Sequence, residues 1–302
     1  MEKKFIITEE NVNSRLDRWF KRSVIDIPQS LLEKSIRKGL IKVNNKKKSS
    51  SYKLLLNDKI VVYESNFIEN KSKKKLLPYK ATQKDISYSS TLFIENNDDF
   101  AVINKPPGIS VQSGTKSRRN ILDILKSTKE FSSSIPFSVH RLDKETTGVL
   151  IVAKNRKYAQ LFTSLFRIRK IHKIYLGIIM GSMLKKKGTI RDDLNYYEGN
   201  QKTTVKAITH FNILDTNNNY SLVKLSPETG RKHQLRKHLL MCGNPILGDA
   251  KYRISKKKPS KNANLMLHAY KINFSINDIK YNFTADPPEY FKKFIDEKYL
   301  KI

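Results

Sequence analysis

The sequence feature that most constrains the fold is a polar, charged turn followed directly by an apolar run. The turn spans residues 140–148 (HRLDKETTG) and the run spans residues 149–153 (VLIVA). The run is short, rich in β-branched residues and bounded by Gly148 and Lys154, which is the pattern of a buried strand. A carboxylate at the entry of such a strand is held in one place, and loops on rigid strands often carry catalytic side chains. Asp143 is therefore the first candidate nucleophile.

The residues around Asp143 suit a carboxylate that stays ionised. Arg141 lies two positions before it and Lys144 lies one position after it. Nearby cations favour the charged form of a carboxylate, as a nucleophile requires, whereas a general acid needs an apolar pocket. The alternative is a turn residue that pairs with a local Arg or caps Thr146. The spacing alone favours neither interpretation.

The composition points to a polyanionic partner. The 302-residue chain carries 59 Lys and Arg against 28 Asp and Glu, a net charge of +31. Nucleic acid is the first candidate, because such a field repels itself and each neutralised phosphate releases counterions. A coding bias is the alternative, since Lys, Asn, Ile and Tyr are all plentiful. The length suits one large domain and one small domain.

Several classes of protein are disfavoured. The single cysteine, Cys242, excludes an internal disulfide and fits a reducing compartment. The first apolar stretch is too short for a signal peptide and no segment reaches the length of a membrane span, so we expect a cytoplasmic protein without a membrane partner. The six His residues lack metal-ligand spacing, and no Gly-rich loop opens a helix after a strand. We therefore expect no metal and no cofactor.

The N-terminal region reads as two basic helices followed by a small sheet. The first helix places Leu16, Trp19 and Phe20 on one face, and the second begins at Pro28 and ends at Gly39. Strands are expected at residues 41–43 and 59–62. The outward faces of the helices carry four cations: Arg18, Arg22, Lys34 and Arg37.

This region resembles the small RNA-binding domain named after ribosomal small-subunit protein four. The matching segments are RLDR at 15–18, IRKG at 36–39, IKVN at 41–44 and NDKI at 57–60. The resemblance implies that Arg18, Arg22, Lys34 and Arg37 contact an RNA backbone. The alternative is that they form solvated helix faces, as most charge runs do.

The remaining chain predicts a second domain behind a linker. We place the RNA-binding domain at residues 1–66, a basic linker at 67–86 and the second domain at 87–302. The linker contains a charge block at 70–75 without apolar periodicity. Many strands, few helices and long connections predict an α+β domain with a mixed, mainly antiparallel sheet, beside a small N-terminal α/β domain.

The second domain resembles the RluA family of RNA pseudouridine synthases. The resemblance rests on ordered segments that cover nearly the whole domain: NKPPG at 104–108, HRLDK at 140–144, TGVL at 147–150, KIY at 173–175, TGRKHQLRKH at 229–238, GNPILGD at 243–249 and LHA at 267–269. With its N-terminal module, the chain is most similar to the RluC type, whose members modify large-subunit ribosomal RNA. Two positions depart from the family pattern: Gln112 stands where His is frequent and Thr147 where Ser is frequent.

The resemblance implies an isomerase that converts uridine in RNA to pseudouridine. The N-glycosidic bond breaks, the uracil turns, and a carbon–carbon bond forms to the same sugar carbon. This reaction involves no redox change and needs no cofactor. The implied partner is large-subunit ribosomal RNA or its precursor particle, and we expect a monomer.

The resemblance also implies roles for individual residues. Asp143 is the essential carboxylate, and Tyr175 packs on the uracil. Arg236 pairs with Asp143, with Arg231 as the second candidate for that role. Arg141 fills the space left when the target uridine leaves the stack. The expected roles of His140, His233 and His238 are structural hydrogen bonds.

Two other functions stay open at this point. One is a noncatalytic RNA-binding or ribosome-assembly protein on the same fold, against which the intact Asp143, Tyr175 and Arg236 argue. The other is a carboxylate-dependent hydrolase of a small anionic substrate, against which the net charge of +31 argues.

Overall fold

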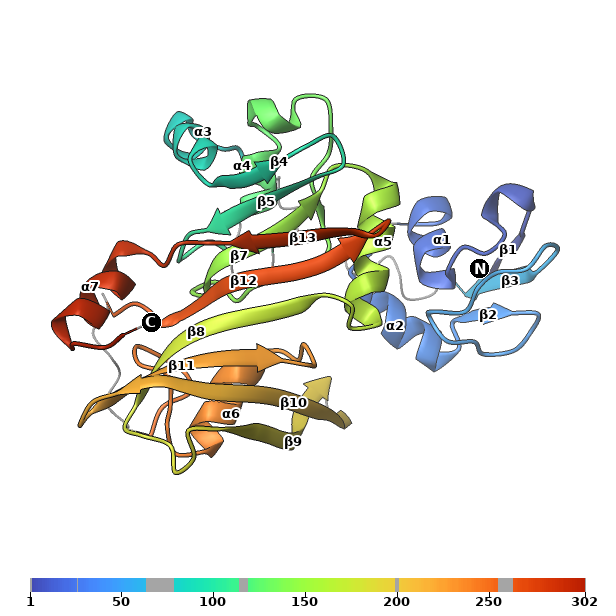
Figure 1. Ribbon diagram of the computed structural model, residues 1–302. Helices are drawn as coiled ribbons and strands as arrows, with labels where there is room; N and C mark the ends of the chain where they lie inside the picture. The colour runs from blue at the N-terminus through green and yellow to red at the C-terminus, as the bar shows by residue number, and fades with distance from the viewer. Residues whose placement is uncertain are drawn as a thin grey trace. The chain divides into compact units, whose positions relative to one another are not determined.

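The chain forms two compact units, Met1–Leu76 and Leu77–Ile302. The computed structural model describes residues 2–25, 27–63, 79–113, 119–198, 201–254 and 263–301 (Figure 1). The charge block at 70–75, predicted to belong to a linker, lies outside the described residues.

The first unit contains the two helices and small sheet that the sequence predicts. Trp19 and Phe20 on the first helix and Leu32 and Ile36 on the second are buried in one cluster. Gly39 ends the second helix with a φ of 78°, a left-handed conformation that glycine adopts without strain. The elements are β1 (Glu2–Ile6), a 3-10 turn (Glu9–Asn11), α1 (Leu16–Ser23), α2 (Gln29–Lys38), β2 (Ile41–Val43) and β3 (Lys59–Tyr63), with sheet order β1-β3-β2.

Residues at the start of the second unit, Leu77–Ile302, form polar contacts with the rest of that unit. Helix α3 (Gln83–Ser90) is capped by Thr82, whose hydroxyl accepts from the Asp85 backbone N–H. The buried Asp85 carboxylate accepts from the Tyr79 hydroxyl at 2.6 Å and from the Arg119 Nε at 3.1 Å. Residues 79–86 are therefore tied to the second unit by polar contacts, which no apolar periodicity could reveal.

The second unit is built on one sheet of ten strands. Its order is β4-β5-β7-β12-β8-β11-β10-β9, with β13 paired to β12 and β6 paired to β7. The β12–β7 pair is parallel and the other pairs are antiparallel, so the prediction of a mixed, mainly antiparallel sheet is confirmed. The strands are β4 (Phe93–Asn96), β5 (Phe100–Lys105), β6 (Phe137–Ser138), β7 (Thr147–Ala153), β8 (His172–Met180), β9 (Lys187–Glu198), β10 (Gln201–Thr216), β11 (Tyr220–Pro227), β12 (Leu267–Ile276) and β13 (Ile279–Thr284).

Helices cover parts of this sheet. Phe162 of α5 is buried with residues of β7 and β12, and Phe291 of α7 is buried with residues of β8 and β11. Figure 1 shows β8 running between β12 and β11. The remaining elements are α4 (Ile121–Leu125), a 3-10 turn (Lys129–Phe131), α5 (Arg156–Arg167), α6 (Gln234–Met241) and α7 (Glu289–Glu297).

The parallel contact between β7 and β12 fixes where the polar turn at 140–148 sits. Gly148 has a φ of 107°, and a Cβ at this position would lie 2.2 Å from the Ala269 carbonyl oxygen. Only glycine allows the two backbones to approach this closely. All residues of β7 are buried, so the apolar run is the rigid strand that the sequence predicts.

Candidate active site

Asp143 lies in the turn that enters β7. Leu142 beside it is buried in the core, and the Thr146 N–H donates to the Asp143 carbonyl oxygen at 3.1 Å. The Asp143 side chain nevertheless keeps 21% of its surface exposed. The turn therefore anchors the backbone and presents the carboxylate.

Two buried side chains hold the ends of this turn. The Lys105 ammonium donates to the carbonyl oxygens of Pro106, Ile109 and Lys144 at 2.8, 2.9 and 3.0 Å. Burial lowers the pKa of Lys105 to about 7, while the charges of Glu145 and Asp143 oppose that shift. At the other end, the His268 ring contacts the Thr147 hydroxyl at 2.8 Å and the Ala285 carbonyl oxygen at 2.9 Å.

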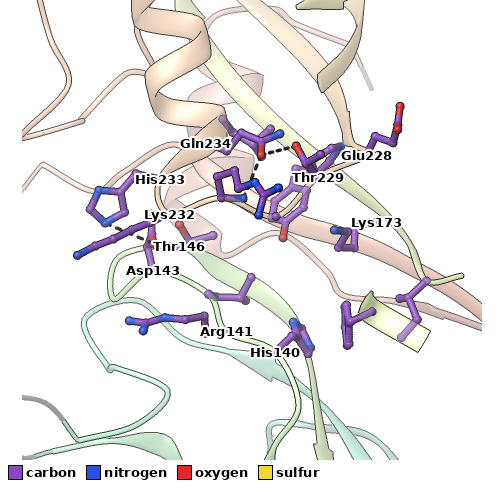
Figure 2. A pocket seen from close by; sticks show the side chains of 18 of the residues that line it. His140, Arg141, Asp143, Thr146, Lys173, Glu228, Thr229, Lys232, His233 and Gln234 are labelled. Atoms are coloured by element: carbon purple, nitrogen blue, oxygen red, sulfur yellow. Dashed lines mark hydrogen bonds and ion pairs between the residues drawn. The ribbon is translucent and has the colours of Figure 1, made fainter. Parts of the chain in front are cut away.

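A second segment, residues 227–236, faces Asp143 from the start of α6. The buried Gln234 amide accepts from the Thr229 hydroxyl at 2.7 Å and from the Arg231 N–H at 3.0 Å. Its own NH₂ group donates to Ile208 and Thr209 on β10, both at 2.9 Å. Figure 2 shows Thr229 and Gln234 joined on one side of the pocket, with His233 and Asp143 nearby. These hydrogen bonds fix the turn that delivers Arg236.

Arg236 connects Asp143 to a second carboxylate. Its Nη1 donates to Asp143 Oδ2 at 3.0 Å, while Nε and Nη2 donate to the two oxygens of Asp249 at 2.6 and 2.8 Å. Burial alone would lower the pKa of Arg236, but the hydrogen bonds and charges of Asp249 and then Asp143 raise it above its ordinary range. This guanidinium is therefore always charged, and its fork is oriented by a bidentate pair.

Asp249 supports the arrangement from a fully buried position. Burial would raise its pKa, but the hydrogen bond from Arg236 and the backbone N–H groups of Tyr252 and Lys251 lower it. A buried charge is tolerated only with such partners. The Tyr252 ring also lies 5.0 Å from the Arg236 guanidinium carbon.

His233 approaches the other oxygen of Asp143 without forming an ion pair. Its Nε2 lies 3.6 Å from Asp143 Oδ1, and its Nδ1 lies 2.8 Å from the Tyr252 hydroxyl. Burial lowers the pKa of His233 to about 4, against the opposing charge of Asp143, so the ring is neutral at neutral pH. The residue adopts a left-handed φ of 55°, a costly conformation of the kind found at functional sites.

A cleft of about 630 Å³ opens in front of these residues. Tyr175 on β8 lines it together with Asp143 and Arg236. Burial and the Asp143 charge raise the pKa of Tyr175 above its ordinary range, so the phenol keeps its proton at neutral pH. Tyr175 can therefore pack against a nucleobase or donate a hydrogen bond from its hydroxyl. It cannot accept a proton as a general base at neutral pH.

The structure brings most of the predicted site residues into this cleft. Arg141 and Arg231 line it with exposed side chains, and it is Arg236 rather than Arg231 that contacts Asp143. His140 is turned inward: its Nε2 accepts from the Ile151 N–H at 2.8 Å, and burial lowers its pKa to about 3.

The remaining predicted residues belong to the first unit. Arg18, Arg22, Lys34 and Arg37 are all exposed on α1 and α2. Arg22 donates to the Ser14 hydroxyl at 3.1 Å. In the described ranges of the chain, no three His, Cys, Asp or Glu side chains converge as they would around a metal ion, and no helix is long and apolar enough to cross a membrane.

Two residues of the site, Asp249 and Lys105, were not identified from the sequence. His233 was named there, but not as a neighbour of Asp143. Asp249 and Lys105 lie inside segments that carry the resemblance, GNPILGD and NKPPG. The sequence offered one indication of Asp249: it is an acidic residue directly after a glycine in a strongly basic chain. Nothing in the spacing indicated that His233 would face the carboxylate.

Known proteins match this chain over most of its length. The family model for RNA pseudouridylate synthase matches residues 99–241. The "Ribosomal large subunit pseudouridine synthase C" of Buchnera aphidicola subsp. Baizongia pistaciae is 34% identical over 89% of this chain and 88% of its own length. The protein of the same name from Rickettsia bellii is 30% identical over 95% of this chain and 99% of its own length.

A solved structure agrees with the same class. "Human RNA Pseudouridylate Synthase Domain Containing 4" superposes with a TM-score of 0.62 at 25% identity, covering 72% of this chain and 96% of that protein. The chain therefore belongs to the RNA pseudouridylate synthase family. The prediction of an RNA pseudouridine synthase of the RluA type is confirmed.

Proposed function

We propose that this enzyme isomerises specific uridines of large-subunit ribosomal RNA to pseudouridine. Two relatives that match nearly the whole chain are named for that RNA. The observation that carries the catalytic assignment is the Asp143 carboxylate, which is part-exposed in the cleft and held at 3.0 Å by the buried Arg236.

In this proposal, Asp143 is the carboxylate that reacts at the extruded uridine. Arg236 donates to that carboxylate and fixes the direction of its oxygens, because Asp249 already orients the guanidinium. Tyr175 packs against the uracil with its phenol protonated. Arg141, exposed at the rim of the cleft, occupies the position that the target base leaves in the stack.

The cleft suits a reaction in which the base is detached and turned. The bond from uracil N1 to the sugar breaks and a bond from uracil C5 forms to the same sugar carbon. C5 then loses its proton and N1 gains one, so the product is an isomer and nothing is oxidised or reduced. The detached uracil must stay in place while it turns. The side chains that line the cleft on several sides would retain it.

We further propose that the first unit binds the RNA backbone through its exposed cations Arg18, Arg22, Lys34 and Arg37. Acting on ribosomal RNA would place the enzyme in the cytoplasm. We also propose that the enzyme acts as a monomer. Light scattering of the protein at the concentration used in activity assays tests whether it is a monomer.

Pseudouridine mapping of ribosomal RNA tests the function. Cells that lack the gene are complemented with the wild type or with Asp143→Asn, which keeps the shape of the side chain and removes its charge. We expect the wild type to restore discrete sites in large-subunit RNA and the variant to restore none. Restoration of the same sites by the variant would instead support the noncatalytic alternative, for which the comparisons give no support.

A further inference from the structure

Lys173 is a cation of the cleft that, unlike Arg236, has no carboxylate partner in the part of the chain that the structure describes. It lies on β8 two residues before Tyr175, and side chains at this spacing point to the same face of a strand. Both side chains line the cleft. Figure 2 shows Lys173 on the side of the pocket where Glu228 lies, away from His233.

Among the described residues, Lys173 makes no hydrogen bond or ion pair. The two carboxylates of the cleft are engaged elsewhere: Asp143 with Arg236 at 3.0 Å, and Glu228 with Arg169 at 2.5 Å. The charged or titratable groups that act on Lys173 are the Arg169 guanidinium and the neutral His140 ring. A half-buried ammonium without an anion is costly, and the cost falls when an anion binds.

Burial lowers the pKa of Lys173, and the nearby Arg169 charge lowers it further. An anion next to the ammonium would oppose both effects. The cleft supplies little negative charge of its own, because its lining includes seven Lys and Arg side chains against two carboxylates. The anion that suits this position must therefore come with the substrate.

Space for such an anion exists beside the ammonium. Gly230 in the turn before α6 is exposed, and a Cβ placed on it would lie 4.0 Å from the Lys173 Nζ. A side chain at this position would cover the ammonium from that direction. The glycine leaves Lys173 open towards the cleft.

We propose that Lys173 forms a phosphate subsite for the RNA linkage that flanks the extruded uridine. A base packed on Tyr175 places its own sugar–phosphate backbone beside the neighbouring side chain on the same face of β8, about 6.6 Å away along the strand. The phosphate supplies the anion that Lys173 lacks, and the Arg169 charge adds to the attraction. This inference rests on the proposed action on RNA.

Neutralising single phosphates tests the subsite. A short RNA that the wild type modifies is prepared with one uncharged methylphosphonate, placed either 5′ or 3′ of the target uridine. We expect one of the two substitutions to weaken wild-type binding about tenfold, the loss of one charge-assisted contact. Lys173→Gln should weaken binding of the natural RNA by a similar factor and be insensitive to that substitution. For Lys173→Gln, the slope of log affinity against log salt should be smaller in magnitude than that of the wild type by about 0.7.

Two further variants serve as controls. Lys271→Gln changes a lysine of the adjacent strand that pairs with Ile174, and therefore lies on the other face of the sheet. It should keep the wild-type salt slope and methylphosphonate sensitivity. Lys173→Arg keeps the positive charge, so its RNA binding should remain sensitive to the methylphosphonate. That result would attribute the change in Lys173→Gln to the lost charge and not to misfolding.

The subsite is refuted if Lys173→Gln responds to both methylphosphonates, and to salt, as the wild type does. A slower reaction at saturating RNA with unchanged methylphosphonate sensitivity would also refute it, because it would place the amine at the base. Absence of pseudouridine in the wild-type reaction would refute the proposed function instead. The two failures are therefore distinguishable.

Discussion

The basic side chains of the two units are held in opposite ways. In the first unit, Arg18 and Arg37 project from α1 and α2 into solvent. In the second unit, Arg236 is buried between two carboxylates and Lys105 is buried among three carbonyl oxygens. The exposed cations can adapt to an RNA backbone, whereas the buried ones are fixed before any substrate arrives. In the proposed function, the same residue types therefore attract RNA in the first unit and orient the catalytic carboxylate in the second.

The largest effect is expected from removing the support of Arg236. Asp249→Asn leaves a buried guanidinium with one carboxylate, and breaking a buried pair costs about 3–5 kcal/mol. We expect the free energy of unfolding of the second unit to fall by that amount and pseudouridine formation to drop steeply. Urea unfolding followed by far-UV circular dichroism measures the first effect. A variant with wild-type stability and rate would show that Asp249 does not hold Arg236 in place.

A smaller effect is expected from pH, and it should separate the two units. All six His residues lie in the second unit. Burial lowers the pKa of the fully buried His268 to about 4, below its unfolded value of about 6.5. The unfolded state therefore binds the proton first, so this stability is complete above pH 6.5 and is lost as pH falls from 6.5 to 4. The loss is about 3 kcal/mol.

The first unit should not respond in that pH range. In the first unit, the hydrogen bond from Arg15 lowers the pKa of the buried Asp17 carboxyl. The stability that this pair contributes is therefore lost only as pH falls below about 4. The only tryptophan, Trp19, is buried in the first unit and reports its unfolding by fluorescence. We expect circular dichroism, but not tryptophan fluorescence, to show weakened resistance to urea between pH 6.5 and 4. His268→Gln should reduce the difference.

The smallest effect is expected from the exposed cations of the first unit. Arg18→Gln and Arg37→Gln should each weaken RNA binding a few-fold and lower the salt slope, while the rate at saturating RNA is unchanged. Binding titrations at several salt concentrations measure this. A matched control is Lys280→Gln on β13, an exposed lysine of the second unit that lies outside the cleft. Equal salt slopes for all three variants would contradict RNA binding by α1 and α2.

The sequence predicted the parts of the molecule that follow local rules. The run at 149–153 was identified as a buried strand because its residues are β-branched and bounded by turn residues, and β7 has this character. The first helix of the first unit was predicted because Leu16, Trp19 and Phe20 follow helical spacing, and all three are buried on α1. Asp143 was found because it lies directly before the strand.

The parts that escaped prediction depend on contacts that are distant in sequence. Helix α3 has no apolar stripe and is held by Asp85 and Arg119. The strands β9 and β10 pair with each other through polar, charged sequences that give no clear alternation. The contact between Asp249 and Arg236 needs the turn at Gly248, whose φ of 78° leaves no room for a side chain beside the Asn264 carbonyl. Such pairings exist only in the folded chain.

The most direct test compares single-turnover rates at saturating RNA for Arg236→Lys and Arg37→Lys, the same substitution in the two environments. Lysine cannot form the bidentate fork to Asp249 and still reach Asp143, so we predict a rate about 10–100-fold below wild type for Arg236→Lys. For Arg37→Lys we predict the wild-type rate. Equal rates for the two variants would contradict the assignment of Arg236 as the group that orients the catalytic Asp143.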